Sequence, residues 1–224
     1  MAGLFSNWFK PKVKYHEGLP PKERIARVFE DHVLPELAKH GFTFDPKQLS
    51  WKIVMDDVTV HIEHKLSKYN TGAGSIEFHP WVTIYSHAYR DWSKRRDGKG
   101  HEGIVYVGAL LHLNDPKGLD APYDLDLGKG DNERIVQHYK KLVVEELLPL
   151  ARSLSTLKGV LDYRRRVENV DNLGYIAVAC AAGDMAEAER ALALFEQYCK
   201  AYTGAADMKG SLEKAHALVR ELKA

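Results

Sequence analysis

Two histidines and two glutamates form the set of residues best suited to chemistry in this sequence. His61, Glu63, Glu77 and His79 occur in two neighbouring segments in which apolar residues occupy every second position. Imidazole and carboxylate groups are ligands that zinc and iron accept, and both groups can act as acid or base. One hypothesis is therefore an enzyme or metal-binding protein that uses this His/Glu cluster.

The same residues also fit the outer face of a sheet without any metal. His61 and His64 point to opposite sides of one strand, and a ladder of opposite charges across strands stabilises a solvated face. Trp81 and Tyr85 fall on the same face as His61, and aromatic side chains dominate the energies of protein contacts. Tyr106 joins them only if its strand pairs in the assumed register. We predict a protein-binding face formed by Trp81, Tyr85, Tyr106, His61, Glu63 and His79, and the His/Glu enzyme or metal site is the alternative.

A third group of residues lies in the connection between Ser86 and His101. Aromatic and basic side chains alternate there, and such mixtures can stack on bases and hold phosphates. Asp91 and Asp97 dilute the charge, and the whole chain has 32 basic against 31 acidic residues. This balance gives no field that would attract nucleic acid, which is not a predicted partner. The residues concerned are Tyr89, Trp92, Arg90, Lys94, Arg95, Arg96 and Lys99.

The strands that position these side chains can be aligned from their own patterns. If Asp56 and Asp57 form a two-residue turn, Trp51 faces Ile62 and Ile53 faces Val60, so the apolar side chains share one face. Centring the next turn on Thr71 places Glu63 opposite His79 and Lys65 opposite Glu77. Both turns predict one antiparallel sheet with an apolar side and a mixed side. Residues 103–113 form a further strand, and residues 123–127 a short one.

Helical patterns flank this sheet. Pro20 and Pro21 open a helix that Pro35 bends and Gly41 ends. A second helix, apolar on one side from Ile135 to Leu150, covers the apolar face of the sheet. After Ser155 the pattern is purely helical. The predicted fold class is α+β, an antiparallel meander packed on one face by helices and followed by a C-terminal helical bundle or hairpin. The predicted regions are an arm (1–20), an α+β domain (21–155) and a helical region (156–224).

Composition is that of an ordinary globular protein. Hydrophobic residues make up 45% and charged residues 28% of the chain, and no stretch approaches ~20 apolar residues, so no membrane span is expected. The first residues lack the features of a secretory signal, and Cys180 and Cys199 resemble small core residues. We therefore expect a cytoplasmic protein with no disulfide. Spacing reveals no metal ligand set, nucleotide fingerprint or catalytic motif, so we predict no cofactor and name no catalytic residue.

The segment from about Pro21 to Ser155 resembles a bacterial family of unknown function. Its members have a helix ending in a leucine, a basic residue and Gly-Phe, then a strand meander, then a helix closing on a Leu-Pro pair. The matching residues are Leu37, Lys39, Gly41 and Phe42, and Leu148 with Pro149. Proteins of this sort are often suspected of being immunity or partner-binding proteins. The resemblance implies a binding role, with immunity-like proteins among the expected functions.

A second resemblance lies in the C-terminal region. Residues 183–188, Gly-Asp-Met-Ala-Glu-Ala, are similar to the turn of a tetratricopeptide hairpin, over about forty residues and without a second copy. Asn172 begins the first helix of this hairpin and Gly183 ends it, and Asp184 with Glu187 predicts a capping box for the next. The resemblance implies a helical hairpin, a motif that generally serves protein contacts.

Overall fold

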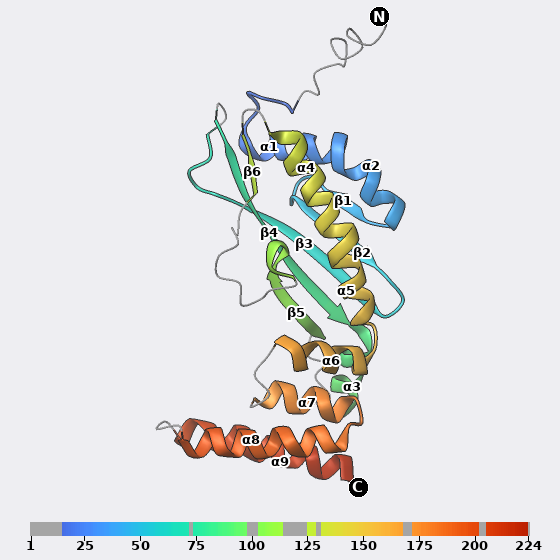
Figure 1. Cartoon of the computed structure of the whole chain (residues 1–224), viewed down its shortest axis with the longest axis vertical. Helices are drawn as coiled ribbons and strands as arrows, with labels where there is room; N and C mark the ends of the chain where they lie inside the picture. Colours follow the sequence, from blue (N-terminus) through green and yellow to red (C-terminus); the bar gives the residue numbers. More distant parts are fainter. Residues whose placement is uncertain are drawn as a thin grey trace, which may run out of the picture.

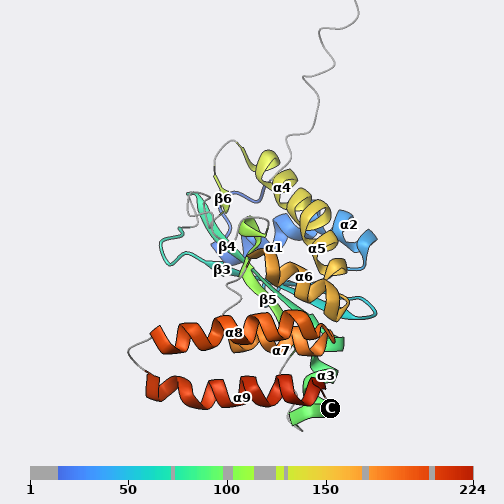
Figure 2. The ribbon, with the colours of Figure 1, turned by 60° about the horizontal axis from the view of Figure 1, so that its bottom comes forward.

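A six-stranded antiparallel sheet forms the centre of the computed structural model, with helices on one of its faces (Figure 1). The structure describes residues 15–71, 74–97, 103–113, 125–128, 131–167, 172–201 and 205–223. Further helices lie beyond one end of the sheet, so the predicted α+β class is confirmed (Figure 2). Most of the predicted arm, residues 1–14, lies outside the described residues.

The strands follow one another in the sheet in the order of the sequence. The path runs from β1 to β5, and β6 pairs with the outer edge of β4 beside β5. The predicted short strand at residues 123–127 is confirmed for its last three residues, while the first two lie outside the described residues. The strands are β1 (Thr43–Asp45), β2 (Ser50–Val54), β3 (Val58–Leu66), β4 (Ile76–Ser86), β5 (Ile104–Ala109) and β6 (Leu125–Leu127).

The first predicted register is confirmed and the second is wrong by two residues. Trp51 pairs with Ile62 across the β2–β3 turn, as its two central residues require. Glu63 pairs with Trp81 instead of His79. The second turn is longer than expected because the side chain of Asn70 replaces strand pairing: its Nδ2 donates to the Glu77 carbonyl at 2.7 Å, and the Glu77 N–H donates to its Oδ1 at 2.8 Å. A shift of two residues keeps every side chain on its predicted face.

Pro80 lies inside β4 at the point where the neighbour on the outer edge changes. β6 pairs with residues 76–78, and β5 pairs with residues 81–85. The N–H of His64, the residue opposite Pro80, donates to the Leu49 carbonyl on the other side of β3. His64 and Pro80 are therefore a pair without mutual hydrogen bonds, and the Pro80 nitrogen faces the outer edge. A backbone N–H at position 80 would point between β6 and β5, where neither strand pairs with β4. Proline lacks this N–H and so fits the position.

Two bent helices cover one face of the sheet, and both bend in the same way. The turn before Pro35 and the turn before Pro149 widen into π-helices. The N–H groups of Leu34 and Leu148 each reach back five residues, because the proline that follows would otherwise clash with the carbonyl four residues before it. The segments are α1 (Pro21–Val28), η1 (Phe29–Val33), α2 (Leu34–Leu37), η2 (Ala38–His40), α4 (Asn132–Lys141), η4 (Leu142–Leu147) and α5 (Leu148–Ser153).

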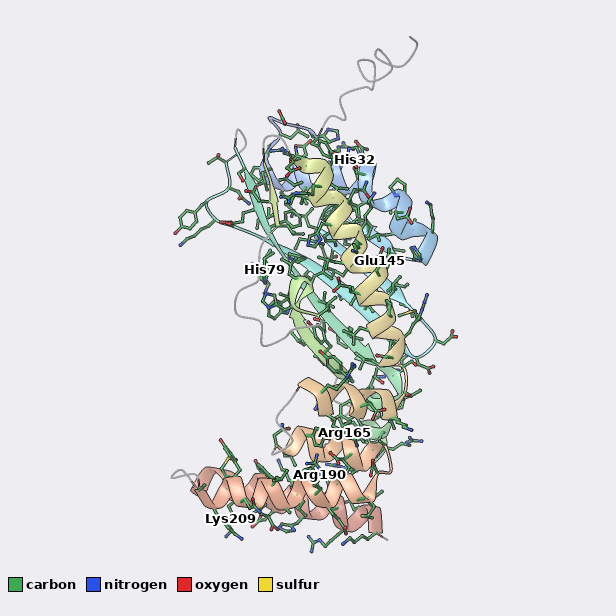
Figure 3. The ribbon with its side chains drawn as sticks, in the orientation of Figure 1. His32, His79, Glu145, Arg165, Arg190 and Lys209 are labelled. Atoms are coloured by element: carbon green, nitrogen blue, oxygen red, sulfur yellow. The ribbon has the colours of Figure 1, made fainter. Side chains whose placement is uncertain are left out.

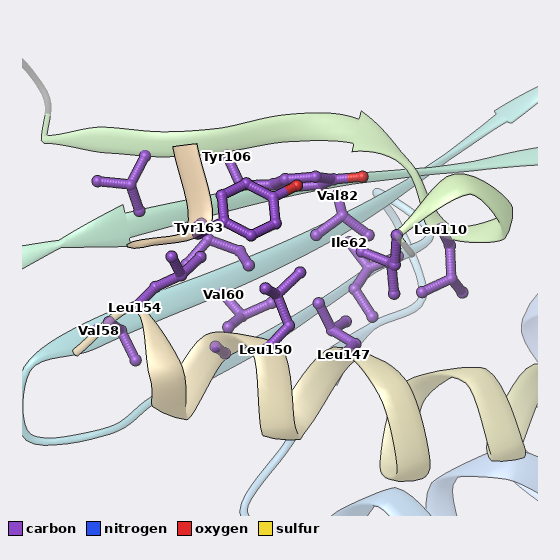
Figure 4. Close-up of a cluster of buried hydrophobic side chains, with 14 of the residues drawn as sticks. Val58, Val60, Ile62, Val82, Tyr106, Leu110, Leu147, Leu150, Leu154 and Tyr163 are labelled. Atoms are coloured by element: carbon purple, nitrogen blue, oxygen red, sulfur yellow. The ribbon is translucent and has the colours of Figure 1, made fainter. Parts of the chain in front are cut away.

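The core lies between these helices and the sheet. Alternate residues of β3 and β4 meet the inner side of η4 and α5, as Figure 4 shows for Val60, Ile62 and Val82 against Leu147 and Leu150. η3 (Leu110–His112) then turns the chain after β5 into the same layer. The periodicity of the sequence therefore predicted the covered face correctly.

One polar side chain is buried in this core with both of its nitrogens bonded. His64 Nδ1 lies 2.6 Å from the Leu49 carbonyl, and Nε2 lies 2.9 Å from the Tyr139 hydroxyl. A carbonyl can only accept, so Nδ1 carries the proton and the Tyr139 hydroxyl donates to Nε2. Burial lowers the pKa of His64 to about 4, which keeps the ring neutral. Phe29 and Phe78 pack against the same imidazole.

The C-terminal helices pack on one another at one end of the sheet (Figure 2). Asn172 caps the N-terminus of α7, and Gly183 ends that segment with a φ of 73°, as predicted. α3, which follows β4 directly, contacts α7. The helices are α3 (His87–Asp97), α6 (Leu157–Val167), α7 (Leu173–Ala181), α8 (Met185–Ala201) and α9 (Ala205–Lys223).

Glu187 completes only half of the predicted capping box. Asp184 Oδ1 accepts the Glu187 N–H at 3.1 Å, but the Glu187 carboxylate turns to Tyr175 and Arg190. Arg190 Nε donates to it at 2.9 Å, and Arg165 of α6 approaches to 3.6 Å (Figure 3). Because Arg190 bonds the charged form, the pKa of Glu187 falls to about 2. This network joins α6, α7 and α8.

Two expectations drawn from composition can be compared with the described residues. Within them, no helix is long and apolar enough to cross a membrane. Cys180 and Cys199 are free and buried, in agreement with the expectation that they form no disulfide. Burial raises the pKa of the Cys180 thiol to about 11, so this thiol is protonated at neutral pH and is a poor nucleophile.

Candidate functional site: the open face of the sheet

The face of the sheet away from α4 and α5 is lined by exposed and half-buried side chains. We call it the open face. Its residues alternate along each strand with the buried ones, so the pattern that builds the core also builds this surface. Cross-strand pairing arranges it in rows across β2, β3, β4 and β5. From the end nearest α3, the rows are Val54, Thr59, Tyr85 and Ile104; Lys52, His61, Thr83 and Val107; and Ser50, Glu63, Trp81 and Ala109, of which Ala109 alone is buried.

Trp81 and Tyr85 lie on the open face as predicted, and both are half-buried. His79 stacks on Trp81 with 5.5 Å between ring centroids, and the Lys65 ammonium lies 5.3 Å from the centre of the same ring. The His61 and Tyr85 rings are nearly perpendicular, with 6.4 Å between their centroids. These neighbours hold each ring in place from one side and leave part of it accessible to solvent. The open face thus presents two oriented aromatic rings.

The prediction that Tyr106 belongs to this face is wrong. Its side chain is 7% exposed and packs in the core against Tyr163, at 6.0 Å between ring centroids (Figure 4). The β4–β5 pairing shifts by one residue between Ile84 and Tyr85, so Tyr106 lies opposite Ile84 on the covered side. A bulge of this kind leaves no pattern in the sequence of β5, because apolar residues occupy both sides of this strand. Gly108 gives the Tyr106 hydroxyl its space, since a Cβ there would lie 2.6 Å from it.

The four residues of the His/Glu hypothesis do not converge. His61 lies opposite Thr83 and His79 opposite Lys65, which separates the two imidazoles by four positions, or about 13 Å along the strands. Glu77 pairs with Asp126 of β6, further along β4. Within the described residues, no three side chains of the types that ligate metals come together. The register that would have brought Glu63 to His79 is the one that the Asn70 turn shifts.

Two exposed apolar residues of the open face were not predicted from the sequence. Val54 is 62% exposed and Val107 is 50% exposed, at positions where alternation leads one to expect polar side chains. They stand on β2 and β5, on either side of the aromatic rings. Since isolated valines are poor indicators of a surface, only the pairing of the strands brings them together with Trp81 and Tyr85.

The basic and aromatic segment after β4 is a helix, α3, and not the connection predicted from its composition. Ser86 supplies the missed signal, because its Oγ accepts the Tyr89 N–H at 3.3 Å and so caps the helix. The helix separates the segment into two sides. Tyr89, Trp92 and Arg96, spaced three and four residues apart, share the side that faces the C-terminal helices. Arg90, Lys94 and Arg95 are exposed, and Lys99 lies outside the described residues.

Comparison with models of protein families, with curated proteins and with solved structures found no match. The two resemblances carried by Leu148 with Pro149 and by residues 183–188 stay predictions. The predicted division at residues 155 and 156 also stays a prediction.

Proposed function

We propose that this protein is a binding module that recognises another protein through the open face of its sheet. The observation that carries the proposal is the pair of oriented, half-buried rings of Trp81 and Tyr85 on that face, with exposed Val54 and Val107 on either side. Interfaces of this type combine aromatic anchors at the centre with a polar rim. The rim here is mixed in charge, with Lys52 and Lys65 against Glu63 and Glu77.

The size of the open face indicates which class of interface it can form. Three to four rows of side chains over four strands cover roughly 500 Å² at ordinary strand spacings. A stable protein interface buries about 800 Å² on each partner. A partner limited to the open face therefore forms a transient complex. Such a contact is best captured covalently inside the cell, because it would dissociate during purification.

Photocrosslinking tests the proposal. Benzoylphenylalanine is placed at Val107 on the open face and, as a control, at Tyr198 on α8, which is 43% exposed. We expect a discrete protein adduct from position 107 that is absent from position 198. The double substitution Trp81→Ala, Tyr85→Ala should remove this adduct, while the melting temperature of the protein changes little.

Three results would contradict the proposal. The first is the absence of any adduct at position 107, and the second is the same adduct from position 198. The third is loss of the folded state in the Trp81→Ala, Tyr85→Ala protein, since the two rings would then belong to the structure and not to a binding surface. The single substitution Trp81→Phe keeps an aromatic anchor and should retain most of the crosslinking.

A further inference from the structure

A cavity of about 910 Å³ lies where α3, α6, α7 and α9 meet the beginning of β5. Small-molecule sites commonly occupy about 300 to 1,000 Å³ and are lined mainly by apolar groups. Ile104 of β5 reaches this cavity, and Ile104 pairs with Tyr85, so the cavity adjoins one end of the open face without sharing its aromatic residues. Its walls come from segments that are distant in sequence, which is why no local motif indicated it.

The inner walls are apolar and aromatic. Tyr89 and Trp92 of α3 lie nearly parallel, with an angle of 14° and 5.8 Å between ring centroids. Leu173 and Ala177 of α7 and Leu218 of α9 line the same cavity. A surface of this composition favours the hydrocarbon or ring part of a ligand over water.

Three cationic side chains line the same cavity. Arg96 comes from α3, Arg164 from the end of α6 and Lys214 from α9. Among the described residues that line it, none is Asp or Glu. The Arg96 guanidinium lies 5.3 Å from the centre of the Trp92 ring, so cation and aromatic wall are adjacent. Arg164 is half-buried, whereas Arg96 and Lys214 are exposed at the mouth.

Gly174 allows Arg164 to reach this position. A Cβ on Gly174 would lie 3.3 Å from Arg164 Nη1, closer than ordinary van der Waals contact. The guanidinium thus rests against the backbone at the start of α7, at the boundary between the apolar wall and the mouth. Arg164 therefore lines the cavity, whereas its neighbour Arg165 lies beside Glu187.

We propose that this cavity binds a small organic anion with an apolar body. The apolar body lies against Trp92 and Leu218, and the anionic group lies at the mouth within reach of Arg96, Arg164 and Lys214. Guanidinium groups suit carboxylate, sulfonate and phosphate oxygens because they offer paired N–H donors in one plane. The proposal is independent of the protein-binding function of the open face.

A pair of fluorescent probes distinguishes the contribution of the cationic side chains from that of the apolar walls. Anilinonaphthalene sulfonate carries an anionic group, and phenylnaphthylamine has the same rings without it. We expect the sulfonate to bind at one site with enhanced fluorescence. Arg164→Gln should weaken its binding about tenfold, the effect of removing one charge-assisted hydrogen bond, and Lys214→Gln should weaken it less. Neither substitution should change the affinity for the uncharged probe.

Matched controls lie on the same helices. Arg95→Gln and Lys209→Gln remove exposed cations of α3 and α9 that do not line the cavity, and they should leave the affinity for the sulfonate unchanged (Figure 3 labels Lys209). Ala177→Phe fills the cavity from α7 and should abolish binding of both probes. Trp81→Ala with Tyr85→Ala should leave both affinities unchanged, which separates this site from the open face.

The proposal is overturned if the sulfonate does not bind, or if Lys214→Gln and Arg164→Gln bind it as tightly as the unaltered protein does. It is also overturned if inorganic phosphate alone, at equal concentration, displaces the probe, because the apolar walls would then contribute nothing. Circular dichroism of each variant shows that it is folded. If Arg164→Gln unfolds, Lys214→Gln decides the question, since the Lys214 side chain is exposed.

Discussion

The two faces of the sheet are built from the same strands, but their side chains differ in how firmly they are held. His61 and His64, which both lie on β3, show this difference. His64 points into the core, where Leu49 and Tyr139 bond both of its nitrogens. His61 points to the open face, where its ring lies nearly perpendicular to the Tyr85 ring, with 6.4 Å between the centroids. The covered face therefore stabilises the fold through fixed partners, and the open face keeps aromatic groups accessible to other molecules.

The largest expected difference between the two faces is the loss of unfolding free energy when one aromatic ring is removed from each. Phe78 on the covered face is 1% exposed, so Phe78→Ala should lower the free energy of unfolding by about 3 to 5 kcal/mol, because it leaves a cavity. Trp81→Ala on the open face should cost about 1 kcal/mol, since solvent already reaches that ring. Urea denaturation of both variants measures the difference. Equal losses would mean that the open face is part of the core.

Protonation of the buried histidine makes the stability of the fold depend on pH. Burial holds the pKa of His64 at about 4 in the folded state, below its value of about 6.5 in the unfolded chain. The unfolded state therefore binds the proton first as the pH falls, and stability that is complete above about pH 7 is lost towards pH 4. This group should lower the free energy of unfolding by about 2 kcal/mol between about pH 7 and pH 5.

Two variants test whether this pH dependence comes from His64. His64→Asn keeps an amide donor for the Leu49 carbonyl but does not titrate, so its unfolding free energy should vary less with pH by that amount. His61→Asn should retain the dependence of the unaltered protein. The opposite result, in which only His61→Asn flattens the profile, would place the buried histidine on the wrong face.

The smallest expected difference in stability between the two faces comes from removing one tyrosine hydroxyl from each. Tyr139→Phe removes the donor to His64 Nε2 and leaves a buried acceptor without its partner, which should cost about 1 to 2 kcal/mol. Tyr85→Phe should change stability by less than about 0.5 kcal/mol, because water can replace any partner of a hydroxyl on the open face. Thermal denaturation with matched buffers resolves a difference of this size, and a larger effect at Tyr85 would contradict the comparison.

The sequence predicts the sheet well where a short turn or a strict alternation determines it. Asp56 and Asp57 leave one way to join β2 and β3, and that register is confirmed. The longer turn at Asn70 cannot be derived in the same way, because a side chain there takes the place of backbone pairing. The error preserved every face, and Trp81 and Tyr85 lie where the alternation placed them.

Features that depend on irregular pairing or on distant segments could not be predicted. The bulge at Ile84 moves Tyr106 into the core, although its neighbours are apolar on both sides and give no hint of it. The cavity brings Arg96, Arg164 and Lys214 together from three helices. No single segment of the sequence contains enough of that arrangement to reveal a site.

Pro80 limits aggregation at the outer edge of β4, beside the exposed aromatic rings of the open face. The outer edge of β4 is divided at the proline into one stretch paired by β6 and another paired by β5. A foreign strand that invaded this edge would meet a residue without an amide donor between two short occupied stretches, so it could not form the long uninterrupted ladder on which amyloid-like stacking depends. The open face can therefore present aromatic rings while this edge of β4 resists aggregation.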